Sequence, residues 1–445
     1  MSVTIETSYG RILGNDRDDC FEFLGIKYAE AKRFEYATPV DKAPENTTEY
    51  DATRFGNVCP QTRTYYEHLE VPERLFYHNE FRKGIKYNYD EDCLNLNIYT
   101  PKNRRNCPVI LFIHGGGFNS GSVKDSSFDG SGFAARGVIL VTINYRVGIL
   151  GYLTHKDIFD RYGRDGNFGL DDQLLAIRWV KRHIADFGGD PDNITLMGQS
   201  AGAISIQYLC LTKKCEGLFK NAVMMSGGGL FPKFALPRPC EKTREYWLDY
   251  MNIAGCESLE DLKQADLKRI FTAIETIKGK RKDNTFNTMP VIDGCLIEGP
   301  VEELIKDPLK INYMIGYTNN DMYAPIMAHI GNKFAKDNGG YVYYFDVDAP
   351  GRDKNSAFHS ADLRYVFETL SLSHRPYDDR DEEIASVMAG CIATFAKTGN
   401  PNAPGLPDWS IAPGKALCIT RKSIKMGRPN YLKLTFNMLT KGDPT

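Results

Sequence analysis

Long apolar runs are absent from the 445-residue chain. A membrane-spanning helix needs about eighteen consecutive apolar residues, and without such a run we expect no membrane partner. An excess of charge of one sign is absent as well, because 55 Lys and Arg residues are balanced by 57 Asp and Glu residues, for a formal net charge of −2. Proteins that bind nucleic acid or anionic surfaces usually carry a basic excess, so this composition favours a small, roughly neutral ligand.

The 11 cysteines lack the closely paired spacing of a zinc site. Their count is odd and they are scattered, which predicts reduced core thiols and no disulfide scaffold. The first residues, MSVTIETSYGRILGN, contain no basic start followed by an apolar core. We therefore expect no secretory signal within this sequence and a cytoplasmic location.

Short apolar runs alternate with helix-length segments, which is typical of an α/β fold with a mostly parallel sheet. The runs predicted as strands are CPVILFIHG, GVILVTINY, NITLMG, AVMMSG, INYMIGYT and YVYYFDV. In LDDQLLAIRWVKRHIADFG, apolar residues recur on one face at helical spacing, namely Leu170, Leu174, Leu175, Trp179, Val180 and Ile184. The charged stretch at 240–282 predicts a helical excursion, placed at about residues 231–310 of a single domain spanning residues 1–445.

The pentapeptide GQSAG places Ser200 between Gly198 and Gly202. It follows the strand-like NITLMG and precedes AGAISIQYLCL, which has helical potential. In this strand-turn-helix setting, GxSxG holds a serine in a strained conformation with its hydroxyl exposed above the sheet. A structural glycine-rich turn is the alternative for the pentapeptide alone, and the context favours a nucleophile.

The segment HGGGF, residues 114–118, follows the apolar run PVILFI. Consecutive glycines let backbone N–H groups converge on one point without obstruction by side chains. Together with the N–H of Ala201, this loop predicts an oxyanion hole, in which each donor contributes about 3 kcal/mol of transition-state stabilisation. A flexible turn is the alternative, which the presence of Ser200 disfavours.

A nucleophilic serine also needs a base, which in this class of fold lies after the acid and the serine. The histidines after Ser200 are His329, His359 and His374. His359, in NSAFHSADLRYVF, lies in a loop-like stretch before a helix-like one and is preferred on that ground, with the other two left as alternatives.

The acid is expected between the serine and the histidine. Asp321 follows the strand-like INYMIGYT, where a loop carboxylate reaches an imidazole. Asp293 and Asp307 are alternatives, and each of the three is also consistent with a solvated loop aspartate.

From about residue 10 to about residue 410, the chain resembles the type B carboxylesterases of the cholinesterase-like α/β-hydrolase family. The resemblance rests on EDCLNLNIYTP, HGGGF, NYRVGILGYL, GNFGLDDQLLAIRWVKRHIADFGGDP, GQSAGA, GYTNNDM and AFHSADLRYVF, in this order. It implies an α/β-hydrolase fold with the helical excursion over the active site. It also implies roles for individual residues: Ser200 as nucleophile, His359 as base, Asp321 as acid, and Gly116, Gly117 and Ala201 as oxyanion donors.

The function expected from this resemblance is hydrolysis of carboxylic esters through an acyl-enzyme, with no cofactor and no metal. A catalytically inactive binding protein on the same scaffold is one alternative. An acyl transferase or amidase that uses the same residues is another.

The chain departs from the family pattern at several points. Gln199 replaces the family's usual glutamate before the nucleophile, and Asp321 stands where many members have glutamate. Secreted relatives often carry a disulfide in the loop that runs here from Cys59 to Cys93, a pair that we expect to remain thiols. None of the 3 tryptophans lies in that loop, so we expect uncharged esters to be preferred over choline esters. Four aromatic residues of the loop are candidates for lining an entrance to the site, and packing in the core or at the surface is their alternative role: Tyr65, Tyr66, Phe76 and Tyr77.

Overall fold

The computed structural model describes residues 1–45, 47–62, 72–103, 105–228, 236–280, 288–321, 324–351 and 356–440. Tyr65 and Tyr66 lie outside these residues, so their expected role at an entrance stays a prediction.

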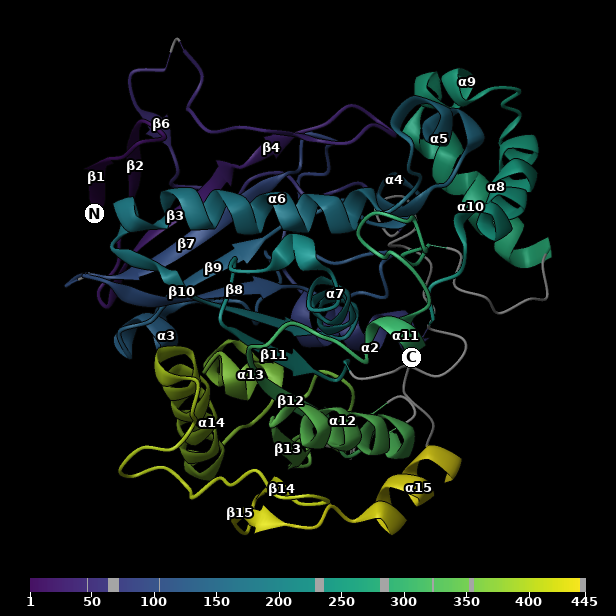
Figure 1. Ribbon diagram of the computed structural model, residues 1–445. Helices are drawn as coiled ribbons and strands as arrows, with labels where there is room; N and C mark the ends of the chain where they lie inside the picture. Colours follow the sequence, from purple (N-terminus) through teal and green to yellow (C-terminus); the bar gives the residue numbers. More distant parts are fainter. Residues whose placement is uncertain are drawn as a thin grey trace.

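A thirteen-stranded sheet runs through the described part of the molecule (Figure 1). Its spatial order is β1 (Ser2–Glu6), β2 (Arg11–Asp16), β3 (Cys20–Lys27), β7 (Asn95–Pro101), β9 (Ile139–Ile143), β8 (Cys107–Ile113), β10 (Gly189–Gln199), β11 (Asn221–Met225), β12 (Asn312–Thr318), β13 (Tyr341–Asp346), β14 (Ala416–Thr420) and β15 (Ile424–Gly427), with β6 (Tyr50–Asp51) beside β2. Neighbouring strands from β9 to β14 are parallel, and antiparallel pairs form both edges. Two short strands, β4 (Ala29–Glu30) and β5 (Thr38–Pro39), pair separately. The predicted mostly parallel α/β sheet is confirmed.

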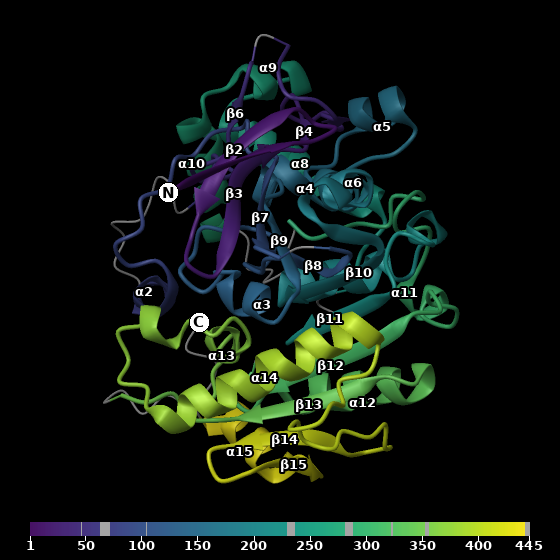
Figure 2. The ribbon, with the colours of Figure 1, turned by 90° about the vertical axis from the view of Figure 1, so that its left-hand side faces the viewer.

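Helices cover both faces of the sheet (Figures 1 and 2). They are α2 (Pro72–Phe81), α3 (Ser131–Ala135), α4 (Gly148–Tyr152), α5 (Lys156–Tyr162), α6 (Phe168–His183), α7 (Ala201–Leu209), α8 (Cys240–Ala254), α9 (Leu259–Gln264), α10 (Leu267–Lys280), α11 (Val301–Leu304), α12 (Ala324–Asn338), α13 (Leu363–Val366), α14 (Asp379–Thr398) and α15 (Tyr431–Thr440).

The alternation of side chains along β8 produces two apolar cores. Val109, Leu111 and Ile113 point into the core that contains the buried face of α6. Ile110 and Phe112 point to the other side of the sheet, into the core that contains α14. Because side chains of a strand alternate between the two faces, a central strand covered by helices on both sides is apolar at every position. This is why the run CPVILFI was recognisable as a strand.

Helix α6 contains the apolar face expected from helical spacing. Leu170, Leu174, Trp179 and Val180 are buried in the same core as the inner side of β8. Leu175 is partly buried against that core, and the helix continues into a short 3-10 turn that includes Ile184.

Helices α8, α9 and α10 lie between β11 and β12 in the sequence and form the lobe at the upper right of Figure 1. A capping box at Ser258 and Asp261 begins α9. The Arg33 guanidinium binds the C-terminal end of α9, donating to Leu262 O at 3.3 Å and to Lys263 O at 3.0 Å. An N-terminal segment of the chain thus anchors this lobe. The division of the chain into domains stays a prediction.

Candidate active site

Ser200 lies at the turn between β10 and α7. Its backbone angles are φ 56° and ψ −125°, a combination that non-glycine residues rarely adopt and that costs of order 1–3 kcal/mol. Its N–H donates to Met225 O at 2.9 Å, and its carbonyl accepts from Ile204 N at 3.0 Å. The flanking strand and helix therefore hold the residue in a strained turn, the geometry that exposes a nucleophilic hydroxyl.

Gly198 and Gly202 lie where the backbone of another segment or turn comes too close for a side chain. A Cβ atom on Gly202 would lie 2.0 Å from Ile113 O, and one on Gly198 would lie 2.7 Å from Gly202 C. No side chain fits at either position, so helix α7 can pack directly against the ends of β8 and β10.

The glycine loop after β8 lies against the Ser200 turn. A Cβ atom on Gly115 would approach Ser200 Cβ to 2.9 Å, and Gly116 has a φ of +118°, which side chains disfavour. Within the described residues, the N–H groups of Gly116, Gly117 and Ala201 donate to no acceptor. These three amides are therefore available to bind an oxygen atom from a ligand.

Side chains outside the loop fix its backbone. Gln61, which is fully buried, accepts from Gly121 N at 3.0 Å and donates to Gly121 O at 3.1 Å. Asn119 Nδ2 donates to Gly117 O at 2.9 Å, and Thr288 Oγ1 donates to Asn119 Oδ1 at 2.5 Å. The loop is thus tied both to the Cys59 segment and to the segment that follows the helical lobe.

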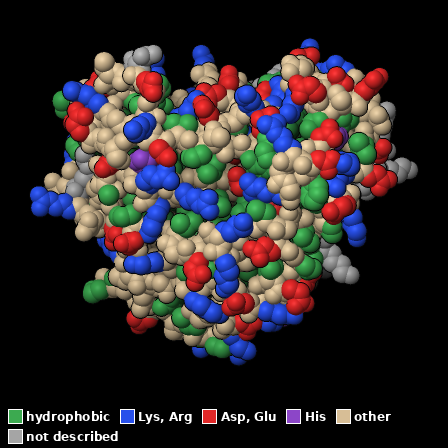
Figure 3. Space-filling model, turned by 45° about the horizontal axis from the view of Figure 1, so that its top comes forward, with side chains coloured by type: hydrophobic (Ala, Val, Ile, Leu, Met, Phe, Trp, Pro, Cys, Tyr) green, Lys and Arg blue, Asp and Glu red, His purple; other side chains and the backbone are tan. Residues whose placement is uncertain are grey.

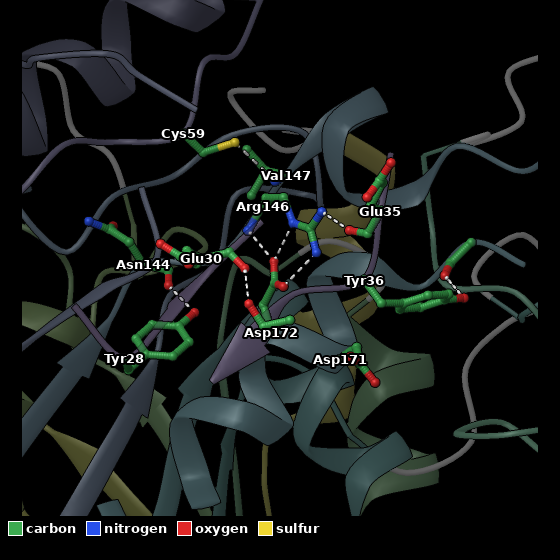
Figure 4. A network of polar contacts seen from close by, with 12 residues as sticks. Tyr28, Glu30, Glu35, Tyr36, Cys59, Asn144, Arg146, Val147, Asp171 and Asp172 are labelled. Carbon is green, nitrogen blue, oxygen red and sulfur yellow. Dashed lines mark hydrogen bonds and ion pairs between the residues drawn. The ribbon is translucent and has the colours of Figure 1, made fainter. Parts of the chain in front are cut away.

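Arg146 and Asp172 form a buried ion pair (Figure 4). Arg146 donates through Nε and Nη2 to the two carboxylate oxygens of Asp172 at 2.8 and 2.7 Å, and through Nη1 to Glu35 O at 2.6 Å. The next residues of this segment reach the glycine loop, because Gly148 N donates to Phe118 O at 2.6 Å. The ion pair therefore fixes a segment that contacts the glycine loop directly.

His359 and Asp321 form a buried pair. His359 Nδ1 donates to Asp321 Oδ1 at 2.5 Å, and the Asp321 side chain is fully buried. A second bond reaches the other carboxylate oxygen, because Thr318 N donates to Asp321 Oδ2 at 3.3 Å. With its Nδ1 proton directed at the carboxylate, the imidazole presents the lone pair of Nε2 on the opposite side.

Gln199 contacts that opposite side of the imidazole. Its Nε2 lies 3.2 Å from His359 Nε2, and its side chain is buried between the Ser200 turn and Gly115. Since Nδ1 carries the proton, the Gln199 amide is the donor in this contact. Within the described residues, Ser200 and His359 are not hydrogen-bonded to each other, and the amide occupies the lone pair instead.

The pKa of Asp321 is below its usual range. Burial opposes ionisation of this carboxyl, but the nearby His359 and the hydrogen bonds to the carboxylate outweigh that effect. A second acid, Asp362, lies in the same region and accepts from Tyr343 OH at 2.7 Å. Burial raises the pKa of Asp362 to about 6, and the charge of Asp321 acts in the same direction. The environment thus favours a charged Asp321 and a less acidic Asp362.

The alternative histidines and aspartates lie elsewhere. His329 is exposed on α12, and His374 is exposed near Glu80. Asp293 accepts the backbone N–H groups of residues 295–297 and fixes a turn, whereas Asp307 binds Lys213 at the surface. Of the three histidines, only His359 is placed against a carboxylate beside the Ser200 turn.

A small apolar cluster adjoins the Ser200 turn and the glycine loop. It consists of Phe118, Tyr152, Ala201 and Met289, with Ile204 packed against it. Phe118 follows the three glycines and Ala201 follows Ser200, so this apolar surface lies close to the candidate nucleophile.

No group of three or more metal-ligating side chains occurs among the described residues. Cys59 and Cys93, both buried, are free thiols in hydrogen-bonding contact.

The parallel sheet with a strained serine at the end of a central strand defines an α/β-hydrolase. The model of the carboxylesterase family matches residues 1–338 and 322–428, which together cover most of the chain. The protein belongs to the carboxylesterase family. The predicted membership of the carboxylesterase family and the predicted activity class, carboxylic ester hydrolase, are confirmed.

Individual relatives agree with this assignment. The chain is 27% identical to the para-nitrobenzyl esterase of Bacillus subtilis over 89% of its own length and 90% of the relative. It is 35% identical to the bile salt-activated lipase of Mus musculus, over 70% of this chain but only 50% of that protein. A solved PNB esterase structure superposes with a TM-score of 0.81 at 25% identity, covering 98% of this chain and 99% of the other.

Several residues that shape the site were not found from the sequence. Gln61, Asn119 and Asp362 contribute through contacts with residues distant in the chain, for which no local motif exists. Gln199 was recognised as a departure from the family, but its contact with His359 Nε2 required the fold.

Proposed function

We propose that this carboxylesterase hydrolyses uncharged carboxylic esters through an acyl-enzyme formed on Ser200. The proposal rests above all on the 2.5 Å hydrogen bond between His359 and Asp321, which lies beside the strained Ser200 turn. It is supported by the unused amides of the glycine loop, which suit a developing oxyanion. In the proposed mechanism, Ser200 is the nucleophile, His359 is the base and Asp321 is the acid.

In the first half of the reaction, Ser200 Oγ attacks the ester carbonyl carbon while His359 Nε2 accepts the hydroxyl proton. For this transfer, the Gln199 amide has to leave the Nε2 lone pair, since one lone pair accepts one proton. The carbonyl oxygen becomes an oxyanion and is bound by the N–H groups of Gly116, Gly117 and Ala201. Collapse of the intermediate breaks the bond to the alcohol, which takes the proton back from Nε2.

In the second half, a water molecule replaces the alcohol. His359 Nε2 accepts a proton from the water, whose oxygen attacks the acyl carbon, and the same amides bind the second oxyanion. Departure of Ser200 Oγ, protonated by the imidazolium, releases the carboxylic acid. Throughout both halves, the Asp321 carboxylate holds the Nδ1 proton and stabilises the imidazolium.

The experiment that tests this proposal is a comparison of Ser200→Ala with Ser205→Ala. Ser205 is a buried serine on the same helix, α7, and serves as a matched control. We expect Ser200→Ala to lower kcat for p-nitrophenyl esters by roughly a thousandfold or more, because the variant lacks the hydroxyl that forms the acyl-enzyme. Ser205→Ala should keep kcat close to that of the wild type, with both variants folded by circular dichroism.

A phosphonate ester should modify the wild-type protein once, at Ser200, as located by peptide mass spectrometry. An adduct on another residue, or an active Ser200→Ala protein, would contradict the mechanism. Release of product ester or amide with an added alcohol or amine, at the expense of free acid, would indicate an acyl transferase instead.

A further inference from the structure

Helix α2 contacts the loop that contains His359. Tyr77 OH donates to the main-chain carbonyl of His359 at 3.1 Å. Phe76 packs edge-on against Phe358, the residue before the histidine, with ring centroids 5.0 Å apart. Phe76 and Tyr77, two of the four aromatic candidates for an entrance, are therefore packed on the histidine loop. Figure 2 shows α2 close to α13, which follows that loop.

The C-terminal end of α2 is anchored to the same part of the chain. Arg375 donates to the Glu80 carboxylate through Nε at 2.9 and 3.0 Å and through Nη2 at 2.6 Å, and both residues are buried. Arg364 donates to the main-chain carbonyl of Glu80. A bidentate pair of this kind fixes orientation as well as distance. The helix is therefore held rigidly against residues 358–375.

The carbonyl that Tyr77 binds belongs to a strained part of the backbone. Ser360, the residue after the histidine, has a φ of +76°, a conformation that non-glycine residues adopt at a cost. On the other side of the histidine, Asn320 N donates to Ala357 O at 2.8 Å and connects the loop to the Asp321 segment. The peptide plane between His359 and Ser360 is thus fixed from outside the loop by the Tyr77 hydroxyl.

We propose that Tyr77 is a positioning residue, whose hydroxyl sets the orientation of the His359 main chain and so places Nε2 for proton transfer from Ser200. The inference rests on the proposed function, since it assigns a partner to the proposed base. Without the hydroxyl, the carbonyl loses this hydrogen bond and the strained peptide is held less firmly. The imidazole then spends less time aligned with both Asp321 and Ser200, and misplacement of a catalytic group by about 1 Å costs up to a hundredfold in rate.

The test is Tyr77→Phe, which keeps the ring, whose centroid lies 6.3 Å from that of Phe358, and removes only the hydroxyl. The matched control is Tyr87→Phe in the same segment, where the hydroxyl donates to Asp125 Oδ1 at 2.7 Å and so binds a side chain from another part of the chain. We expect Tyr77→Phe to lower kcat roughly tenfold with KM changed less than about twofold, because the loss affects alignment rather than substrate binding. Tyr87→Phe should keep the wild-type kcat.

Labelling by a phosphonate ester separates positioning from simple loss of folded protein. A positioning role predicts one labelled site per chain in Tyr77→Phe, formed with a rate constant lowered by about the same factor as kcat. Fewer labelled sites with an unchanged rate constant, a wild-type kcat, or an equal loss in Tyr87→Phe would overturn the inference. A wild-type protein that is not labelled at Ser200 would instead refute the proposed function.

Discussion

At the scale of single residues, Gln199 distinguishes this site from a site with a carboxylate before the nucleophile. Its neutral amide lies 3.2 Å from His359 Nε2, the atom that we propose as acceptor of the serine proton. An amide at this position donates to the neutral imidazole and adds no negative charge to stabilise the imidazolium. The carboxylate in hydrogen-bonding contact with the imidazole is therefore that of Asp321, on the Nδ1 side.

Gln199→Glu should raise the pH midpoint of the acid limb of kcat/KM by about one unit or more, because a carboxylate close to Nε2 favours the imidazolium. The sign follows from the base having to be unprotonated to act, so a stabilised imidazolium moves activity to higher pH. The measurement is a pH–rate profile with a neutral ester. Gln264→Glu, which adds the same charge at an exposed position on α9, is the control and should leave the midpoint unchanged. An unchanged midpoint in Gln199→Glu would show that this residue does not act on the base.

At the scale of secondary structure elements, the buried Arg146–Asp172 pair joins the segment after β9 to helix α6. Its side chains are only 5% and 0% exposed, so neither charge has water as an alternative partner. Removal of one member leaves an unpaired buried charge, which is far more costly than the net value of the pair.

Arg146→Met or Asp172→Leu alone should lower the free energy of unfolding by about 3–5 kcal/mol, and the double variant should lose less than the two single losses combined. Urea unfolding followed by fluorescence gives these values. Lys156→Met, which removes an exposed ion pair with Asp160, is the control and should cost less than about 1 kcal/mol. A single variant as stable as the wild type would refute the structural role of the pair.

The elements themselves were predictable because their signals are local. The strands β8 and β9 are apolar at nearly every position, since both faces of a central parallel strand are covered. The position of Ser200 followed from a motif of five residues with the correct flanking elements. In contrast, the contact of Tyr77 with His359 joins residues far apart in the sequence, and no local pattern signals it. Spacing alone likewise left three histidines as alternatives, and it is the packing against Asp321 that distinguishes His359.

At the scale of the whole molecule, no strong field of one sign is expected. Lys and Arg side chains are interspersed with Asp and Glu over the face shown in Figure 3, in accord with the formal net charge of −2. In the described ranges, no helix is both long enough and apolar enough to cross a bilayer. The 3 tryptophans all serve in packing: Trp179 against His183, Trp247 against Tyr250, and Trp409 against Tyr341.

A choline ester should therefore be no better a substrate than its uncharged 3,3-dimethylbutyl isostere by more than a few-fold. A tyrosine face at an exposed cation site contributes only about 0.5–1 kcal/mol, and Gln199 offers no carboxylate to the cation. The measurement compares kcat/KM for the two esters in the same buffer. A preference for choline above roughly a hundredfold, which corresponds to about 2.7 kcal/mol, would reveal a cation site.

The position of β10 between β8 and β11 has a consequence for how the protein acquires its activity. The strained turn at Ser200 depends on β10 being in parallel register with both neighbours, and parallel neighbours require long crossover connections. Such distant pairings form slowly during folding, because the entropy of closing long loops must be overcome first. During synthesis, a chain that ends before β11 lacks the Met225 carbonyl that holds the Ser200 amide, and it also lacks Asp321 and His359. The strained serine turn and its proposed partners are thus assembled only in the finished fold, and a nascent chain that ends before β11 does not yet contain them.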